Sequence, residues 1–423
     1  CMDHHPLKDA LVNELHNRPF PVVAMPAQIS SLVFLHTGDR QDELNKLAEL
    51  AHLYGVAVPS ENADCYYQSF ADFDLRWEFH NEFSTYTVVR QGRAESEFFK
   101  DVFSLIDQSW VDGISGQLIA ANHIDLRPAA DTPATEEALG EYFNGQRLVG
   151  GTIYEGLATL WTSVQAESDG FIRTLVVDDG LNPSQAGRVV RNLLEIAAYR
   201  SMTLLALPTA RLLMPEVRQL EQRLVDTNDK LNMLITLEDE QNLMNELIAE
   251  ATQLEKLVAD HNFRFSATEA YFNLTESRLD MLREKKMPTM RTLKQFHARR
   301  FIPAFNTCMS IVKRKENLSK RISRTSELLH LRLQLSLETQ NQELLASMDK
   351  RSELQLRLQQ TVEGLSVVAM TYYSMNLIEL LTKPLPIEEY LPISHSMALA
   401  VATPIVFVIA ILGVIRIRKK LHS

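Results

Sequence analysis

The chain has 423 residues, of which 45% are hydrophobic and 23% are charged, a composition that excludes wholesale disorder. Its 15 Gly and 16 Pro are too few for a collagen-like or low-complexity protein. The net charge of −11 is divided unevenly, because residues 1–187 carry 28 acidic and only 11 basic side chains, which disfavours a polyanionic partner for this half.

Residues 1–187 are predicted to form an acidic mixed α/β cytoplasmic domain, because strand-like runs alternate with helical patterns. Three short runs are apolar or β-branched, as strands are: residues 29–35, 85–89 and 174–177. Residues 43–54 have apolar side chains at helical spacing and end at Gly55, which predicts a helix with a glycine C-cap. The same periodicity predicts a second helix over residues 95–106.

Residues 188–363 are predicted to form a long-helix stalk, because they contain no Gly and are rich in strong helix formers. Helices are expected to be interrupted at the four prolines of this segment: Pro208, Pro215, Pro288 and Pro303. Residues 326–360 carry too many Leu for one narrow stripe, so they are expected to pack against several partners and to build an oligomer by coiled-coil contacts. The fold class predicted for the whole chain is α+β.

Residues 283–324 form a strongly basic stretch with 13 Lys or Arg and two acids. Such a density could contact nucleic acid, anionic lipid or the acidic first domain. No nucleic-acid-binding motif accompanies it, so nucleic acid is disfavoured as a partner. The favoured interpretation is a helix face that is solvated or paired within the chain.

Residues 397–415 are nineteen uncharged residues, long enough to cross a bilayer core of about 30 Å. Residues 364–382 are a weaker second candidate, since they contain Asn376 and Glu379. Together with the short connection between them, they predict a C-terminal transmembrane hairpin over residues 364–423, with the lipid bilayer as a partner.

The topology follows from the basic cluster at residues 416–420, which the positive-inside rule places in the cytoplasm. Two spans put both termini on that side and leave a short periplasmic loop. No apolar signal segment occurs near Met2. The expected location is therefore the bacterial inner membrane with both termini cytoplasmic.

A polar stripe is predicted on the first of these spans. Tyr372, Asn376, Glu379 and Lys383 stand at positions i, i+4, i+7 and i+11, on one face of a helix. Polar groups in lipid must face protein or water, which implies self-association. The alternative is that Asn376 bonds to a neighbouring helix while Glu379 pairs with Lys383 at the membrane surface.

No catalytic signature is found in the sequence. The phosphate-binding, dinucleotide-binding, serine-hydrolase and zinc-protease motifs are missing, so neither an enzyme nor a bound cofactor is expected. The three Cys lack the spacing of a zinc site. Asp178 and Asp179 stand in a run of turn formers, which favours a role as turn residues over a role as metal ligands.

Five long blocks resemble a family of uncharacterised membrane-anchored bacterial proteins, classed as a domain of unknown function, and the resemblance covers nearly the whole chain. The blocks are residues 13–20 (NELHNRPF), 76–88 (RWEFHNEFSTYTV), 193–211 (LLEIAAYRSMTLLALPTAR), 299–308 (RRFIPAFNTC) and 340–373, which begins QNQELLASMD. The family supplies no activity.

The layout of an acidic domain, long helices, two closely spaced C-terminal spans and a basic tail is also similar, more distantly, to the CorA-type divalent-cation channels. That resemblance implies a homo-oligomer, a pentamer in that family, whose first span lines the pore and ends in Gly-Met-Asn. Here Ser374, Met375 and Asn376 match two of those three residues, and they stand about a dozen residues into the span instead of at its end.

Two functions follow from these patterns. The first is an oligomeric channel for a divalent cation such as magnesium, with Tyr372, Asn376 and Glu379 lining the pore. Glu388 and Glu389 would then concentrate cations at the outer mouth. The second is a membrane-anchored scaffold or interaction protein without transport activity.

Overall fold

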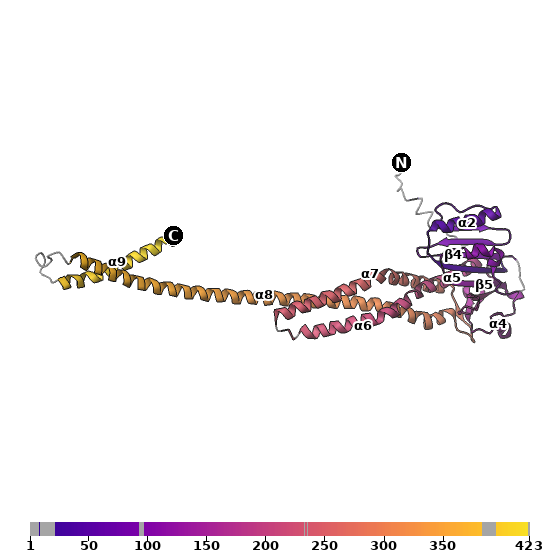
Figure 1. Ribbon diagram of the computed structural model, residues 1–423. Coiled ribbons are helices and arrows are strands. Elements are labelled where there is room, and N and C mark those ends of the chain that lie inside the picture. The colour runs from indigo at the N-terminus through magenta and orange to yellow at the C-terminus, as the bar shows by residue number, and fades with distance from the viewer. Residues whose placement is uncertain are drawn as a thin grey trace, which may run out of the picture. The chain divides into compact units, whose positions relative to one another are not determined.

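A computed structural model describes residue 8 and residues 22–92, 97–231, 233–234, 236–382 and 395–421. The chain consists of two compact units. The first unit comprises Cys1–Asn232 and Asn245–Thr325, and the second comprises Met233–Met244 and Ser326–Ser423. A mixed sheet and long helices confirm the α+β fold class (Figure 1).

One sheet of nine strands, in the order β2-β3-β4-β1-β5-β8-β7-β6-β9, forms the centre of the described part of the first unit. Its strands are β1 (Ala27–Leu35), β2 (Cys65–Ser69), β3 (Asp74–Phe79), β4 (Phe83–Gln91), β5 (Gln117–Pro128), β6 (Val149–Ile153), β7 (Ala158–Thr162), β8 (Ile172–Asp178) and β9 (Lys285–Lys286). Neighbouring strands are antiparallel except for β5 and β8, which are parallel. The three predicted strand runs lie within β1, β4 and β8, which confirms them.

Helices cover both faces of this sheet. Successive side chains of β1 point to opposite faces and pack against different helices. Leu32 packs with α2 (Arg40–Tyr54), α3 (Gln108–Asp112) and the 3₁₀ turn η1 (Val102–Leu105). Val33, one residue on, packs on the opposite face with α5 (Pro183–Leu204). The helix α2 ends at Gly55, which has φ of 66°, so the predicted glycine C-cap is confirmed.

The helix predicted over residues 95–106 is wrong for the part that the structure describes. Residues 97–101 are not helical, and only the four-residue turn η1 follows them. The backbone N–H of Phe99 donates to Asp125 Oδ2, and that of Val102 donates to Ser30 Oγ. Side chains of the sheet thus take the backbone donors that a helix would bond internally.

Three helices form a bundle in the first unit: α6 (Ala206–Leu231), α7 (Leu237–Met281) from Asn245 on, and the start of α8 (Leu293–Thr382). Arg314 of α8 bonds Glu221 of α6 in this bundle. Pro215 and Pro303 lie inside helices, so the prediction that helices break at every proline is wrong. Packing of the buried helix faces compensates for the loss of the backbone hydrogen bond that each proline removes. Pro288 does lie between two helices, α7 and α8.

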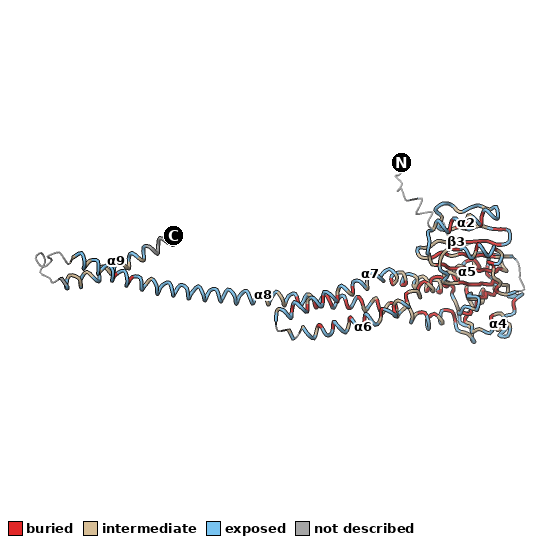
Figure 2. The backbone as a smooth tube through the Cα atoms, in the orientation of Figure 1, coloured by how far each residue is buried: buried red, intermediate tan, exposed pale blue. Residues whose placement is uncertain are grey.

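The second unit contains the rest of α8, the first residues of α7, and α9 (His395–Leu421). Arg332 of α8 holds the beginning of α7 by bonds to Glu240 and to the carbonyl oxygen of Leu234. Beyond Ser336 the side chains of α8 are mostly exposed (Figure 2).

Candidate functional site

The residues predicted to line a pore lie near the C-terminal end of α8. Tyr372, Asn376 and Glu379 are all exposed. They share one face of an uninterrupted helix of 90 residues. Glu388 and Glu389, the predicted outer-mouth residues, lie outside the described residues.

A different stripe of α8 is covered within the chain. Val367 and Thr371 are buried, and Met375 and Ile378 are half-buried. At about 100° per residue, the polar stripe lies roughly 100° around the helix axis from this covered stripe. The chain itself therefore leaves the polar stripe without a packing partner among the described residues.

The helix α9 carries the clearest membrane signal. The segment Ser396–Arg416 is 21 residues long, which suits a bilayer core of about 30 Å. Its most apolar part is not buried against the rest of the chain. Within the described residues it is the one helix that meets this criterion. One apolar helix near the C-terminus can thus serve as a membrane anchor, and the predicted first span is the end of α8 instead of a separate helix.

The helix α9 folds back beside α8. Val414 of α9 lines a groove together with Leu358, Val362 and Ser366 of α8. The two helices therefore run antiparallel within the second unit.

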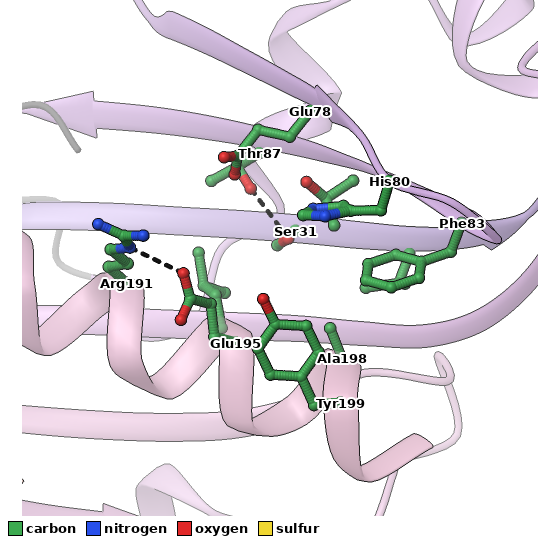
Figure 3. Close-up of a pocket in the computed structure, with 12 residues that line it drawn as sticks. Ser31, Glu78, His80, Phe83, Thr87, Arg191, Glu195, Ala198 and Tyr199 are labelled. Carbon is green, nitrogen blue, oxygen red and sulfur yellow. Dashed lines mark hydrogen bonds and ion pairs between the residues drawn. The ribbon is translucent and has the colours of Figure 1, made fainter. Parts of the chain in front are cut away.

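A polar pocket of about 430 Å³, its open mouth included, lies in the first unit between the sheet and α5 (Figure 3). Strands β1, β3 and β4 supply its floor, where Ser31 Oγ lies 3.0 Å from Thr87 Oγ1. The helix α5 supplies Arg191, Glu195 and Tyr199 from the other side.

Ion pairs occupy the carboxylates of this pocket. Arg191 donates to Glu195 at 2.7 Å, Arg278 of α7 also bonds Glu195, and Arg76 donates to Glu78 at 2.7 Å. Burial, with Glu195 nearby, raises the pKa of Tyr199 to about 12, so the phenol stays protonated at neutral pH. This arrangement fastens α7 to α5, and the pocket can hold water or a small polar molecule. It does not present an unpaired carboxylate as a general base.

Sequence reasoning did not find this pocket. Its local signals are the spacing of Arg191 and Glu195, four residues apart on a helix, and that of Arg76 and Glu78, two residues apart on a strand. Arg278, the second partner of Glu195, lies 83 residues away in sequence and leaves no pattern.

The acidic residues considered as metal ligands fall into local structure. Asp178 Oδ1 accepts hydrogen bonds from the backbone N–H groups of Gly180 and Leu181, which confirms it as a turn residue. Across the described ranges, no group of three or more His, Cys, Asp or Glu is placed to hold a metal ion.

Comparison with known proteins gives a family without an activity. No curated protein matches the sequence. Residues 3–421 match the family described as "Protein of unknown function (DUF3422)". Because this match covers nearly the whole chain, the protein belongs to the DUF3422 family.

Proposed function

We propose that the chain is a membrane-anchored homo-oligomer whose copies associate along the second part of α8. The observation that supports this proposal is a row of exposed apolar side chains, called here the α8 seam. The seam consists of Leu337, Leu344, Leu354, Leu358, Leu365, Val368 and Tyr372, and each of them is exposed.

The spacing of the seam supports a coiled coil. Its members all fall on the a and d positions of one heptad frame, in which Leu354 is d and Leu358 is a. A straight helix has 3.6 residues per turn, so a repeat of seven stays on one face only if the helices supercoil about each other. Exposed apolar side chains at this spacing are typical of a helix that packs against another helix.

A second copy of the chain is the packing partner that fits the α8 seam best. The anchor α9 inserts every copy into the membrane in the same direction, so the α8 helices of neighbouring copies run parallel and at the same height. Each seam residue then meets its own counterpart, and the heptads are in register.

The mass of the purified complex tests this assembly. In mild detergent the wild-type chain is expected to form an oligomer, and Leu354→Gln with Leu358→Gln is expected to reduce its mass. The matched control is Leu345→Gln with Leu356→Gln, two exposed leucines of the same helix that lie off the seam. A wild-type monomer, or equal masses for both double variants, would contradict the proposal.

The finer topology belongs to the same proposal. Residues 364–382 serve as a second span, so α8 and α9 form a hairpin in the bacterial inner membrane with both termini in the cytoplasm. The basic residues that begin at Arg416 support this orientation. Reporter fusions at Ser423 and near Met2 should both report a cytoplasmic position, and a periplasmic signal at either end would overturn it.

Divalent-cation conduction is a second candidate, and one observation favours it. Glu379 stands seven residues after Tyr372, in the same heptad frame as the seam, and Asn376 is exposed beside it. In an oligomer these side chains would form rings of carboxylates and amides, which suit hard, partly hydrated cations.

Flux into proteoliposomes separates conduction from a scaffold. Conduction predicts uptake of Mg²⁺, Mn²⁺, Co²⁺, Ni²⁺ or Zn²⁺ above that of empty liposomes, and a large change with Glu379→Gln. An oligomer that gives no flux of any of these ions would leave the scaffold as the function.

A further inference from the structure

A large basic cleft lies in the first unit, on the edge of the sheet formed by β6 and β9. Its volume is about 2130 Å³, open mouth included. Five exposed cationic side chains line it, and its lining contains no Asp or Glu. These five, the cleft cations, are Arg147, Lys286, Arg291, Arg299 and Arg300.

Two glycines of β6 bring the walls of this basic cleft together. A Cβ on Gly150 would lie 1.9 Å from the carbonyl oxygen of Leu160, and one on Gly151 would lie 2.4 Å from that of Lys285. The N–H of Gly150 also donates to the carbonyl oxygen of Arg291 at 2.8 Å. Close backbone approach therefore fixes β9 and the turn before α8, which carry two of the cleft cations.

Three other basic residues of the basic stretch are paired with carboxylates, unlike the cleft cations. Lys294 pairs with Asp280, Arg314 with Glu221, and Arg283 with Glu155. None of the five cleft cations forms an ion pair with a carboxylate in the described part of the chain.

Glu284, the acid nearest to them in sequence, is also engaged elsewhere. Its carboxylate accepts the backbone N–H groups of Leu293 and Lys294 at 2.8 and 3.1 Å, at the start of α8. It therefore occupies the anion site that the helix N-terminus offers. The positive charge of the basic cleft is left without a counter-charge from the described residues.

A second basic surface of the first unit is neutralised to a larger extent than the basic cleft. The cavity beside α5 is lined by Arg188, Arg191, Arg278 and Arg283. Three of these arginines bind carboxylates of the chain: Arg191 and Arg278 bond Glu195, and Arg283 pairs with Glu155. That cavity is largely neutralised from within, whereas the basic cleft is not.

One wall of the basic cleft combines apolar surface with a constrained backbone. Leu148, Met290 and Phe296 are half-buried lining residues. Val164, also in the lining, has φ of 50°, which is rare for a β-branched residue. Such costly conformations occur preferentially where a protein clamps a ligand.

We infer that the basic cleft binds a soluble small molecule that carries two or more phosphate groups, such as a nucleoside triphosphate. Guanidinium groups bind phosphate oxygens through paired, charge-assisted hydrogen bonds, and four of the five cleft cations are arginines. The apolar wall suits the base or another uncharged part of the ligand.

The concave shape favours a small ligand over a nucleic acid. A polynucleotide needs basic residues spread along an extended track, and it would meet the acidic remainder of residues 1–187. The inference is independent of self-association through α8, because every residue of the cleft belongs to the first unit.

Equilibrium binding to the full-length chain in detergent tests the inference, with ATP and inorganic tripolyphosphate as probes. Arg299→Gln with Arg300→Gln is expected to weaken binding of at least one probe by about tenfold or more. Lys320→Gln with Arg324→Gln removes the same charge from exposed positions of the same helix outside the cleft, and is expected to change affinity by less than about twofold. Equal unfolding temperatures show that both variants are folded.

The two probes and a third arm distinguish the sources of phosphate. Tighter binding of ATP than of tripolyphosphate supports a nucleotide, and equal binding supports recognition of the phosphates alone. Anionic phospholipid vesicles and double-stranded DNA form the third arm. Binding confined to vesicles or DNA, binding of neither soluble probe, or equal weakening by both double variants would overturn the inference.

Discussion

Thr371 and Tyr372 are consecutive residues of α8, yet Thr371 is 8% exposed and Tyr372 is 64% exposed. The covered stripe and the α8 seam thus pass side by side along one helix. A helix with two apolar faces needs two packing partners, and the described residues supply only one of them. The second partner is the basis of the proposed assembly.

A buried carboxylate beneath α2 provides a prediction about stability. Glu43 Oε2 accepts hydrogen bonds from Trp77 Nε1 at 2.7 Å and from the hydroxyl of Tyr86 at 2.9 Å. Glu43→Leu leaves both donors unpaired and should lower the free energy of unfolding by about 2–5 kcal/mol. Glu43→Gln keeps an acceptor and should cost clearly less.

Urea denaturation followed by tryptophan fluorescence measures this difference, since all three Trp lie in the first unit, which contains Glu43. Equal losses for the leucine and glutamine variants would show that the two hydrogen bonds do not matter.

A buried histidine predicts acid sensitivity. His123 Nδ1 lies 2.9 Å from Ser30 Oγ, which also accepts the backbone N–H of Val102. Burial lowers the pKa of His123 to about 4. The unfolded chain takes up this proton near pH 6.5, so stability is lost as the pH falls from 6.5 towards 4.

The size of the effect can be measured by substitution. Between pH 7 and pH 5 the contribution of His123 to the loss is about 2 kcal/mol. His123→Gln should reduce the pH dependence of the urea midpoint accordingly. His297, whose pKa is also lowered to about 4, contributes to the pH dependence of both the wild type and the variant. An unchanged pH dependence in the variant would contradict the assignment.

The close approach at Gly150 predicts a steric defect. Gly150→Ala places a methyl group against the backbone of Leu160 in β7, which should lower the free energy of unfolding by about 2 kcal/mol or more. Gly140→Ala is the control, because a Cβ there meets nothing within 4 Å and α4 (Glu136–Tyr142) is a helix, where Ala is preferred. Thermal unfolding compares them. A defect no larger than that of the control would mean that β6 can shift.

The sequence predicted the elements whose conformation depends on residues close together in the chain. Strand β1 and helix α2 follow from apolar spacing and from Gly55. The segment before η1 could not be predicted, because the groups that bond its backbone, Asp125 and Ser30, lie 26 and 72 residues away in sequence. Pro303 was misleading, because packing overrides the local cost of a proline in a long helix.

The candidate sites also differ in whether their residues lie close together in the sequence. The spacing of Tyr372, Asn376 and Glu379 placed them on one helix face, as the structure has them. The basic cleft could not be assembled from sequence, because Arg147 joins four cations that follow it by more than 130 residues. The basic stretch indicated charge, but not which of its residues are paired.

Cysteine cross-linking tests the proposed assembly most directly, because it reads out the α8 seam by position. Leu354 and Leu356 are both exposed, at 59% and 53%, and lie about 160° apart around the helix. In a chain whose own Cys are replaced, oxidation in membranes should give disulfide-linked dimers with Leu354→Cys and few or none with Leu356→Cys. Equal cross-linking at both positions, or none at Leu354→Cys, would contradict self-association through the seam.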